Sequence, residues 1–444
     1  MPSPNAPSRR EAWTAIAIAI VGGLLALVVR WYYVTHAQVL QPLNLPNVRA
    51  DAVDYYRYAW NMVHHATFAN EVPGSLVIHP NSFRDPGYPA LLALWMEVTD
   101  SYDTWYAGIL LTQALFGALT VAFLVLAMRG RAPNVLLAIA ATLMAIWPHS
   151  VAMSSFVLSE NLLALLCAAG LLCLRSATDR PRWMVLVTSG VLFGLAALTN
   201  AVLLPMAAII AIVLCARRIV DRRTAVIFAL TSLLLPTAWG IRSMTLDPAG
   251  GAVQRASMNL VQGSWPTYHA AYQLAMRNDA EGLRTSAAID SEIASFQQGT
   301  GAGLSTLCSR MCAAPMTYLG WYLKKPALLW SWDIRIGQGD IYVYPTRNSP
   351  FVAVAAWRAV EGACFLLNPL LLFLATVGAV AAIARRTSVG IEAAMATLVL
   401  AITAVYTILQ SEPRYSVAFR GIEIALAITG ISALGSLLSR PRKT

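Results

Sequence analysis

The chain has 444 residues, of which 57% are hydrophobic and only 12% are charged. Soluble domains carry about 25% charged residues, so this composition excludes a soluble enzyme and indicates an integral membrane protein. We attribute the formal net charge of +10 to basic residues in cytoplasmic loops, and we expect no nucleic acid among the partners.

Apolar runs predict an all-α polytopic membrane protein with about ten transmembrane helices. A helix rises 1.5 Å per residue, so a run of about 20 residues crosses the hydrocarbon core. The predicted spans cover residues 13–33, 105–128, 134–147, 160–174, 183–199, 201–216, 224–244, 363–384, 387–409 and 417–438. We expect a kink at Pro236 in the seventh span.

The distribution of basic residues predicts the orientation. The loops assigned to the inner side carry Arg pairs such as Arg385 and Arg386, and cytoplasmic loops are enriched in such residues. We therefore place both termini in the cytoplasm of a bacterial inner membrane. These termini are residues 1–12, which we expect to be disordered, and the tail 439–444.

Two long polar regions face the outer side. Residues 35–104 form the first, within an N-terminal transmembrane module of residues 13–244, and residues 245–350 form the second. Residues 351–438 complete the C-terminal transmembrane helices. Outer loops of this length are usually functional. We expect juxtamembrane helices in both, including an amphipathic segment over residues 318–332.

Acidic side chains at the membrane boundary are the first candidates for chemistry. Asp51 and Asp54 follow the first span, and a carboxylate there serves as a general base or holds a cation or substrate amine. The alternative is that either residue caps the next helix; the two interpretations weigh equally for Asp54, whereas we favour function for Asp51. Glu160 opens the fourth span, as a functional acid or as a residue favoured by the helix dipole.

Basic side chains near the outer surface are candidates for phosphate binding. A guanidinium grips phosphate with two hydrogen bonds, so Arg414 suits a lipid phosphate; a snorkelling interfacial Arg is the alternative. Glu412 is a candidate partner for Arg414. Lys324 and Lys325 lie in the aromatic segment and bind a lipid phosphate or, as we favour, anionic lipid head groups in general.

Four short motifs carry a resemblance to a known superfamily. The stretch DAVDYYRYAWNM resembles the first-loop motif of the GT-C glycosyltransferases, in particular the family 39-like branch with the protein O-mannosyltransferases and the aminoarabinose transferase of lipid A. Asp51, Tyr55, Ala59 and Met62 occupy the motif positions. The family has a second acid directly after the first, but this chain has Ala52 there.

The other three motifs follow in the same order as in that superfamily. FRDPGYPALL resembles a proline-rich segment, in which Arg84, Pro86, Tyr88 and Pro89 match and Asp85 replaces a proline. SSFVLSENLLALL resembles the segment with the second recurring acid, here Glu160. SEPRYSVAFR resembles the Arg-Tyr that opens the last span, here Arg414 and Tyr415.

The resemblance implies a GT-C-like bundle and an inverting glycosyltransferase, either a hexosyl- or a pentosyltransferase. The donor would be a sugar on polyprenyl phosphate, and the acceptor a lipid, polysaccharide or protein at the outer face of the membrane. Asp51 would be the catalytic base, and Arg414, with Lys324 and Arg84 as lesser candidates, would hold the phosphate. Asp54 and Glu160 would position the acceptor or a divalent cation, the involvement of which the sequence leaves open. The remaining substrate-binding candidates are Tyr55, Asp85, Tyr88 and Tyr415.

Two other classes of membrane protein remain as alternatives. A polytopic transporter or flippase would also show outer acids, but it would carry ionisable residues near the middle of its spans. A Wzy-like polysaccharide polymerase or ligase would also use lipid-linked sugars. Membrane lipids are expected partners in every case.

Overall fold

A computed structural model describes residues 9–43, 45, 48, 50–179, 182–246, 251–334, 344–384 and 390–438. Parts of the predicted cytoplasmic segments, namely residues 1–8, Arg385, Arg386 and the tail 439–444, lie outside the described residues.

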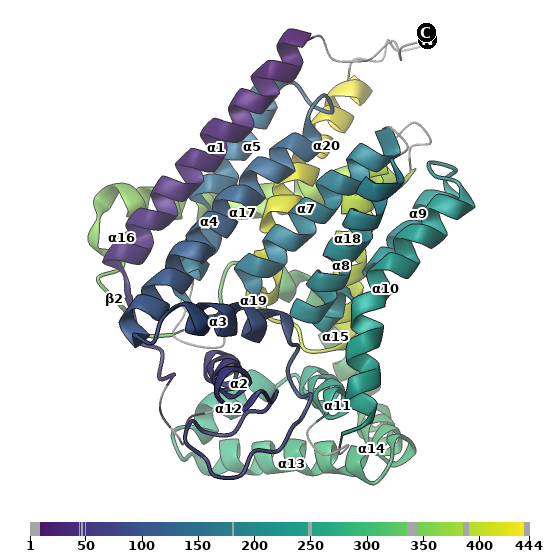
Figure 1. The fold of residues 1–444 in the computed structure, drawn as a ribbon. Coiled ribbons are helices and arrows are strands. Elements are labelled where there is room, and N and C mark those ends of the chain that lie inside the picture. Colours follow the sequence, from purple (N-terminus) through teal and green to yellow (C-terminus); the bar gives the residue numbers. More distant parts are fainter. Residues whose placement is uncertain are drawn as a thin grey trace.

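A bundle of long apolar helices forms the larger part of the molecule (Figure 1). Each of the ten predicted spans corresponds to a helix. These helices are α1 (Arg9–His36), α4 (Tyr102–Met128), α5 (Asn134–Ile146), α7 (Glu160–Asp179), α8 (Trp183–Thr199), α9 (Met206–Ala216), α10 (Arg222–Met244), α17 (Ala355–Ala384), α18 (Gly390–Ile408) and α20 (Arg420–Leu438).

Length and composition separate these helices into two groups. Among the described residues, seven helices are long and apolar enough to cross a membrane, and a bent pair makes an eighth candidate. The helices α8 and α9 are apolar but shorter. The chain is therefore a multi-pass membrane protein, with fewer full-length spans by this criterion than the ten predicted from apolar runs.

The first helix of the bent pair ends close to the predicted end of the third span, but short helices follow it where the sequence predicts a turn. Helix α5 ends at Ile146, and α6 (Pro148–Ala152) and the 3₁₀ turn η1 (Met153–Ser155) continue at an angle of 50°. Proline has no backbone N–H and cannot continue the hydrogen-bond ladder, which explains the break before Pro148. Helix α10 contains Pro236, the position of the predicted kink, and runs through it without interruption.

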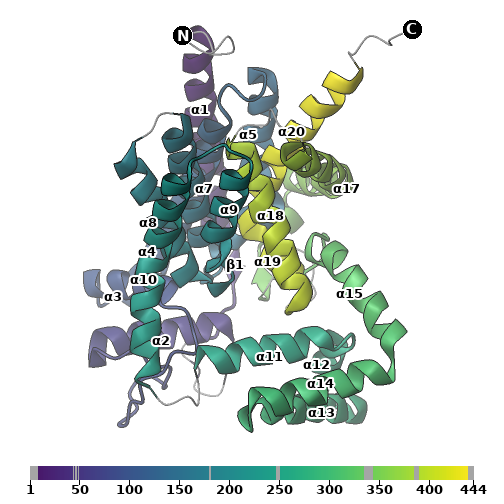
Figure 2. The same ribbon diagram turned by 90° about the vertical axis from the view of Figure 1, so that its right-hand side faces the viewer.

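Shorter helices form an outer layer at one end of the bundle. Figure 2 shows this layer at the end opposite to the start of α1 and the end of α20. It contains α2 (Asp51–His65), α3 (Gly87–Val98), α11 (Ala252–Ser264), α12 (Tyr268–Ala275), α13 (Ala280–Gln297), α14 (Thr300–Ala313) and α15 (Pro315–Leu329). Short connecting elements are η2 (Ala201–Leu203), α16 (Pro350–Ala353), α19 (Pro413–Ser416) and η3 (Val417–Phe419).

One pair of short strands joins the two outer regions. Strand β1 (Gln38–Val39) pairs antiparallel with β2 (Thr346–Arg347). The sequence shows no strand pattern there, since each strand has only two residues. The pairing holds the start of the first outer region against the end of the second.

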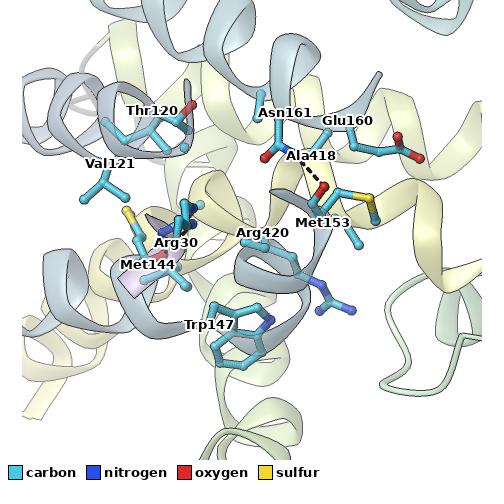
Figure 3. Close-up of a pocket in the computed structure, with 17 residues that line it drawn as sticks. Arg30, Thr120, Val121, Met144, Trp147, Met153, Glu160, Asn161, Ala418 and Arg420 are labelled. Atoms are coloured by element: carbon cyan, nitrogen blue, oxygen red, sulfur yellow. Dashed lines mark hydrogen bonds between the residues drawn. The ribbon is translucent and has the colours of Figure 1, made fainter. Parts of the chain in front are cut away.

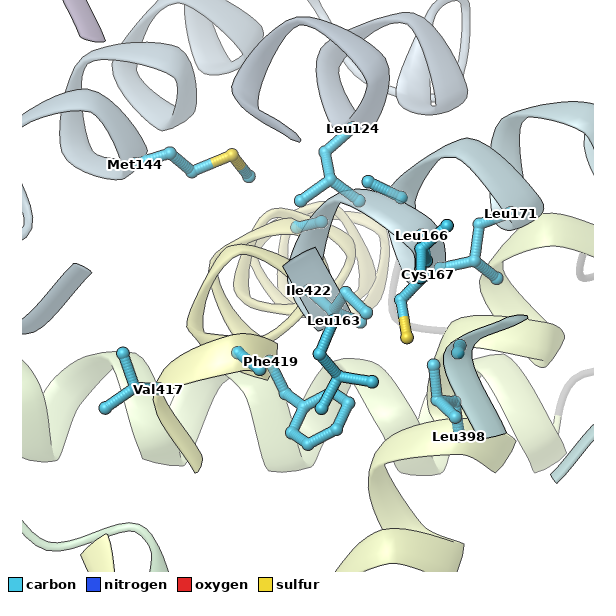
Figure 4. Packing of buried hydrophobic residues seen from close by; sticks show 14 of the residues in the cluster. Leu124, Met144, Leu163, Leu166, Cys167, Leu171, Leu398, Val417, Phe419 and Ile422 are labelled. Carbon is cyan, nitrogen blue, oxygen red and sulfur yellow. The ribbon is translucent and has the colours of Figure 1, made fainter. Parts of the chain in front are cut away.

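Two apolar cores hold these parts together. The large core lies inside the bundle (Figure 4). Its side chains include Leu124 of α4, Leu163 of α7, Leu398 of α18 and Ile422 of α20. Small residues allow close helix contact: a Cβ on Gly430 of α20 would lie 2.1 Å from a backbone oxygen of α17. The small core joins α11, α13 and α14 through Val261, Ile289 and Leu307, so the outer layer has packing of its own.

Candidate active site

Helix α2 presents two carboxylates at its first turn. The residue before the helix, Ala50, is extended, and no side chain caps the helix. The capping alternative for Asp51 and Asp54 is therefore wrong, although the dipole of α2 still favours negative charge at this end. The Tyr344 hydroxyl supports the same turn by accepting the N–H of Ala52 at 3.4 Å.

The carboxylate of Asp51 lies between two guanidinium groups. Nη2 of Arg84 is 2.7 Å from Oδ1 of Asp51, and Nη2 of Arg414 donates to Oδ2. Arg84 also donates to Oδ2 of Asp54, through Nε at 3.0 Å and Nη2 at 2.7 Å. One arginine therefore joins the two acids of α2, and a second arginine from the far end of the chain holds the first acid.

Glu160 extends this network into the bundle. Nε of Arg414 lies 3.0 Å from Oε1 of Glu160 at the start of α7. The connected groups are Asp54, Arg84, Asp51, Arg414 and Glu160. Three carboxylates and two guanidiniums give a formal charge of −1. The network draws on α2, the loop before α3, α7 and α19, and so it assembles only when the whole chain folds.

Burial and the two arginines have opposite effects on Asp51. Burial raises the pKa of Asp51, but the positive charges of Arg84 and then of Arg414 outweigh it and hold this pKa well below its usual range. Asp51 is therefore ionised at neutral pH. A carboxylate so strongly stabilised accepts a proton poorly until at least one guanidinium moves away.

Tyrosine rings form the wall beside this network. The ring of Tyr55 packs edge-on against Tyr88 at 5.2 Å, and Arg84 lies 5.7 Å from its centre. Burial raises the pKa of Tyr55 to about 12, so its hydroxyl stays neutral. Tyr88 donates to Gln113 at 3.0 Å. Arg414 lies 5.5 Å from the ring centre of Tyr415, which stacks on Tyr406 at 5.0 Å, so each of the two arginines lies against one tyrosine ring.

Two predicted substrate-binding residues lie outside the network of ion pairs around Asp51. Asp85 forms an ion pair with Arg255 of α11 at 2.6 Å and accepts the N–H of Ala201 at 3.0 Å; it joins the first outer region to the second. Lys324 is exposed. Its neighbour Lys325 is buried and donates to the carbonyl oxygens of Gly263, at 2.9 Å, and of Leu409.

The second outer region contributes residues that the sequence analysis missed. Nε2 of His269 in α12 lies 3.4 Å from Oε2 of Glu412. Glu412 therefore pairs with a histidine, whereas the sequence named Arg414 as its candidate partner. Next to it, burial raises the pKa of Tyr268, and smaller contributions come from the charges of Asp51 and Glu412. No sequence motif marks Tyr268 or His269, because only the fold brings α12 to the first loop.

The acids near α2 are poorly arranged for a divalent cation. Asp51, Asp54 and Glu160 each lie against a guanidinium, and a cation would have to displace these arginines. Within the described ranges, no group of three or more His, Cys, Asp or Glu side chains is placed to hold a metal ion. The arrangement itself favours binding of an anion by arginines.

Comparisons with known proteins identify the class of fold. Residues 79–241 match the family model described as dolichyl-phosphate-mannose-protein mannosyltransferase, which belongs to the GT-C superfamily. No curated protein sequence matches the chain. The matched segment contains Arg84 and Glu160 of the network.

A solved oligosaccharyltransferase structure has a similar fold, and a second solved structure matches less well. The oligosaccharyltransferase AglB of Archaeoglobus fulgidus, in complex with an inhibitory peptide and a dolichol-phosphate, gives a TM-score of 0.50 at 16% identity, over 97% of this chain and 51% of that one. ArnT of Cupriavidus metallidurans, bound to undecaprenyl phosphate, gives a TM-score of 0.38 at 14% identity, over 94% and 79%.

The chain is a GT-C-fold membrane protein. The likeness to AglB shows this fold, and residues 79–241 match a family model of the superfamily that the sequence motifs predicted. The chain spans about half the length of AglB.

Proposed function

We propose that this protein is an inverting glycosyltransferase, which moves a sugar from a polyprenyl phosphate to an acceptor at the outer face of the bacterial inner membrane. One observation carries the proposal: the carboxylate of Asp51 is held by two arginines, Arg84 and Arg414, at the end of a membrane bundle. A base and a phosphate clamp in contact are the two parts that such a transfer needs.

A lipid-phosphate donor fits the chemistry of the site. The description of the matching family names dolichyl-phosphate-mannose, and AglB was solved with a dolichol-phosphate. In this chain, Arg84 and Arg414 are 18% and 13% exposed in their side chains, so an anion that reached them would be largely desolvated. Guanidinium groups bind phosphate oxygens with paired hydrogen bonds.

We infer that the donor phosphate and Asp51 compete for the same guanidinium groups. In the structure, Asp51 occupies one N–H of each arginine. When the phosphate takes these donors, the stabilisation of the Asp51 carboxylate weakens and its pKa rises toward the usual value. Donor binding thereby converts Asp51 from a poor proton acceptor into an effective one.

The chemical step is then a single displacement at the anomeric carbon of the sugar. The acceptor hydroxyl oxygen forms a bond to this carbon while the bond from carbon to the phosphate oxygen breaks. The proton of the acceptor passes to Asp51, and the electron pair of the broken bond stays on the phosphate, which Arg84 and Arg414 stabilise. Attack opposite to the leaving group inverts the anomeric configuration.

The acceptor approaches from the second outer region in this proposal. Tyr268 and His269 of α12 reach the vicinity of Asp51 and Glu412, and α11–α14 have their own apolar core. Asp54 and Glu160 anchor the two arginines and so position the clamp. The GT-C fold favours this function over the transporter and the Wzy-like alternatives.

Transfer of a labelled sugar tests the proposal. Membranes that contain the protein should move a radiolabelled sugar from undecaprenyl phosphate to an extractable product. Asp51→Asn should abolish this transfer, whereas Asp103→Asn, at an exposed acid at the outer start of α4, should leave it unchanged. Full activity of a correctly inserted Asp51→Asn protein would reject the proposed base.

A further inference from the structure

A small cavity lies inside the bundle, next to the candidate active site. Its volume is about 30 Å³, and its wall comes from α1, α4, α5, α6, α7 and α20. Figure 3 shows Arg30, Trp147, Glu160 and Arg420 among the side chains that line it. Glu160 therefore borders both this cavity and, through Arg414, the Asp51 network.

Arg30 reaches this cavity because of the break between α5 and α6. Pro148 has no N–H, so the carbonyl of Met144 lacks its helical partner. Arg30 replaces it, with Nη2 at 3.4 Å from this oxygen and Nη1 at 2.9 Å from the oxygen of Ala145. Arg30 is only 2% exposed, although it lies near the end of the first predicted span.

The absence of a side chain at position 117 gives the guanidinium its room. A Cβ on Gly117 of α4 would lie 2.2 Å from Nε of Arg30. Arg30 is thus built into the bundle as a buried arginine with one N–H on the side of α4. The two other nitrogens of the guanidinium, Nη1 and Nη2, donate to carbonyl oxygens of α5.

Four polar atoms in the cavity wall lack a protein partner. Among the described residues, Nε of Arg30, Nε1 of Trp147, Oε2 of Glu160 and Nε of Arg420 are buried without a hydrogen bond. An unsatisfied buried polar group costs about 1–3 kcal/mol, so four around one cavity indicate a ligand. Three are N–H donors and one is a carboxylate oxygen, and water can both accept from the former and donate to the latter.

We propose that this cavity is an internal hydration site, in which ordered water is hydrogen-bonded to Arg30, Trp147, Glu160 and Arg420. Its volume suits on the order of two water molecules, each of which needs two to four polar partners. A phosphate or a sugar is too large for it. The site does not depend on the proposed transfer reaction.

This water gives Glu160 a second source of hydrogen bonds. Oε1 of Glu160 lies 3.0 Å from Nε of Arg414, and Oε2 is the buried oxygen without a protein hydrogen bond that the proposed water would bind. When Arg414 turns to a donor phosphate, Glu160 keeps hydrogen-bond partners inside the bundle. This consequence, unlike the hydration site itself, rests on the proposed function.

Radiolytic hydroxyl-radical footprinting of the full-length protein in nanodiscs tests the hydration site. Radicals formed from bound water oxidise nearby side chains, including buried ones. Met144 and Met153 line the cavity and are 5% and 1% exposed, whereas Met206 and Met395 are 0% exposed and do not line it. We expect Met144 and Met153 to be oxidised several-fold faster than Met206 and Met395.

A variant pair makes the test specific. Arg30→Leu removes a polar wall and should slow the oxidation of Met144 and Met153. Arg175→Leu removes another buried arginine, which binds the carbonyl of Ala127 at 2.8 Å away from the cavity, and should leave both rates unchanged. Equal oxidation of all four methionines in the unmodified protein would overturn the proposal, even if Arg30→Leu failed to fold.

Discussion

Arg414 donates a hydrogen bond to Asp51, although 363 positions separate the two residues in the chain. Neither side chain is more than 25% exposed. Removal of one partner from such a pair leaves a charge without compensation. Here the second arginine, Arg84, still contacts Asp51, so the fold tolerates the departure of Arg414 better than an isolated pair would.

Replacement of Arg414 by lysine should weaken binding of undecaprenyl phosphate. Lysine keeps the charge but loses the planar guanidinium, which donates a hydrogen bond to Asp51 and lies 3.0 Å from Glu160. Loss of one charged hydrogen bond, about 1.5–3 kcal/mol, corresponds to roughly ten- to hundredfold weaker binding. Native mass spectrometry of the purified protein measures this, and unchanged affinity would exclude Arg414 from the clamp.

The pH dependence of transfer should differ between kcat/KM and kcat. The first reports the free enzyme and the second the donor complex. In the free enzyme, Arg84 and Arg414 hold the pKa of Asp51 well below its ordinary value of about 3.9. After donor binding this pKa rises, so the acidic limb of kcat should lie at higher pH than that of kcat/KM. Coincident limbs would contradict competition for the arginines.

The same shift affects stability in acid. Because the pKa of Asp51 is lower in the folded than in the unfolded protein, its contribution to stability is complete above about pH 4 and is lost as the pH falls further. Thermal unfolding between neutral pH and pH 3 measures it. Asp51→Asn should unfold with a weaker dependence on pH in this range, and an identical dependence would argue against the ion pairs.

Lys325 should matter for the docking of the outer layer, and its neighbour should not. Lys325 donates to carbonyl oxygens of α11 and of the chain after α18, whereas Lys324 is exposed. Lys325→Met should therefore raise the rate of proteolysis within residues 251–334, and Lys324→Met should not. Equal proteolysis of both variants would show that this contact is dispensable.

The burial of Lys325 should also make the folded protein more stable as the pH rises. Burial lowers its pKa to about 7, below the value of about 10.4 for an unfolded lysine. Between these values the unfolded chain binds more protons, so stability should increase from about pH 7 to pH 10. Lys325→Met should show less of this increase when melting temperatures are compared, and a full increase in the variant would assign it to another group.

The parts of the fold that the sequence predicts are those that depend on neighbouring residues in the chain. Each apolar run is a local property, so all ten spans appear as helices, and the outer layer is helical as expected. The pairing of the two-residue strands depends on contacts between distant segments. The packing of α11, α13 and α14 on each other joins segments that are separate in the sequence, so it is not visible there.

The candidate site shows the same limit. The sequence names Asp51, Asp54, Arg84, Glu160 and Arg414, and the fold brings all five into one network; their roles as base and clamp stay predictions. The sequence does not reveal which of these side chains pair with each other, because the tertiary structure decides the pairing. Lys324 and Lys325 are adjacent in sequence but about 100° apart around a helix, so only the structure distinguishes the buried one.

The most direct test of the account measures the affinity of Asp51→Asn for undecaprenyl phosphate. If the carboxylate of Asp51 competes with the donor phosphate for Arg84 and Arg414, its neutralisation should make this lipid bind more tightly while transfer is lost. Weaker or unchanged binding in a folded Asp51→Asn protein would contradict the competition on which the proposed mechanism depends.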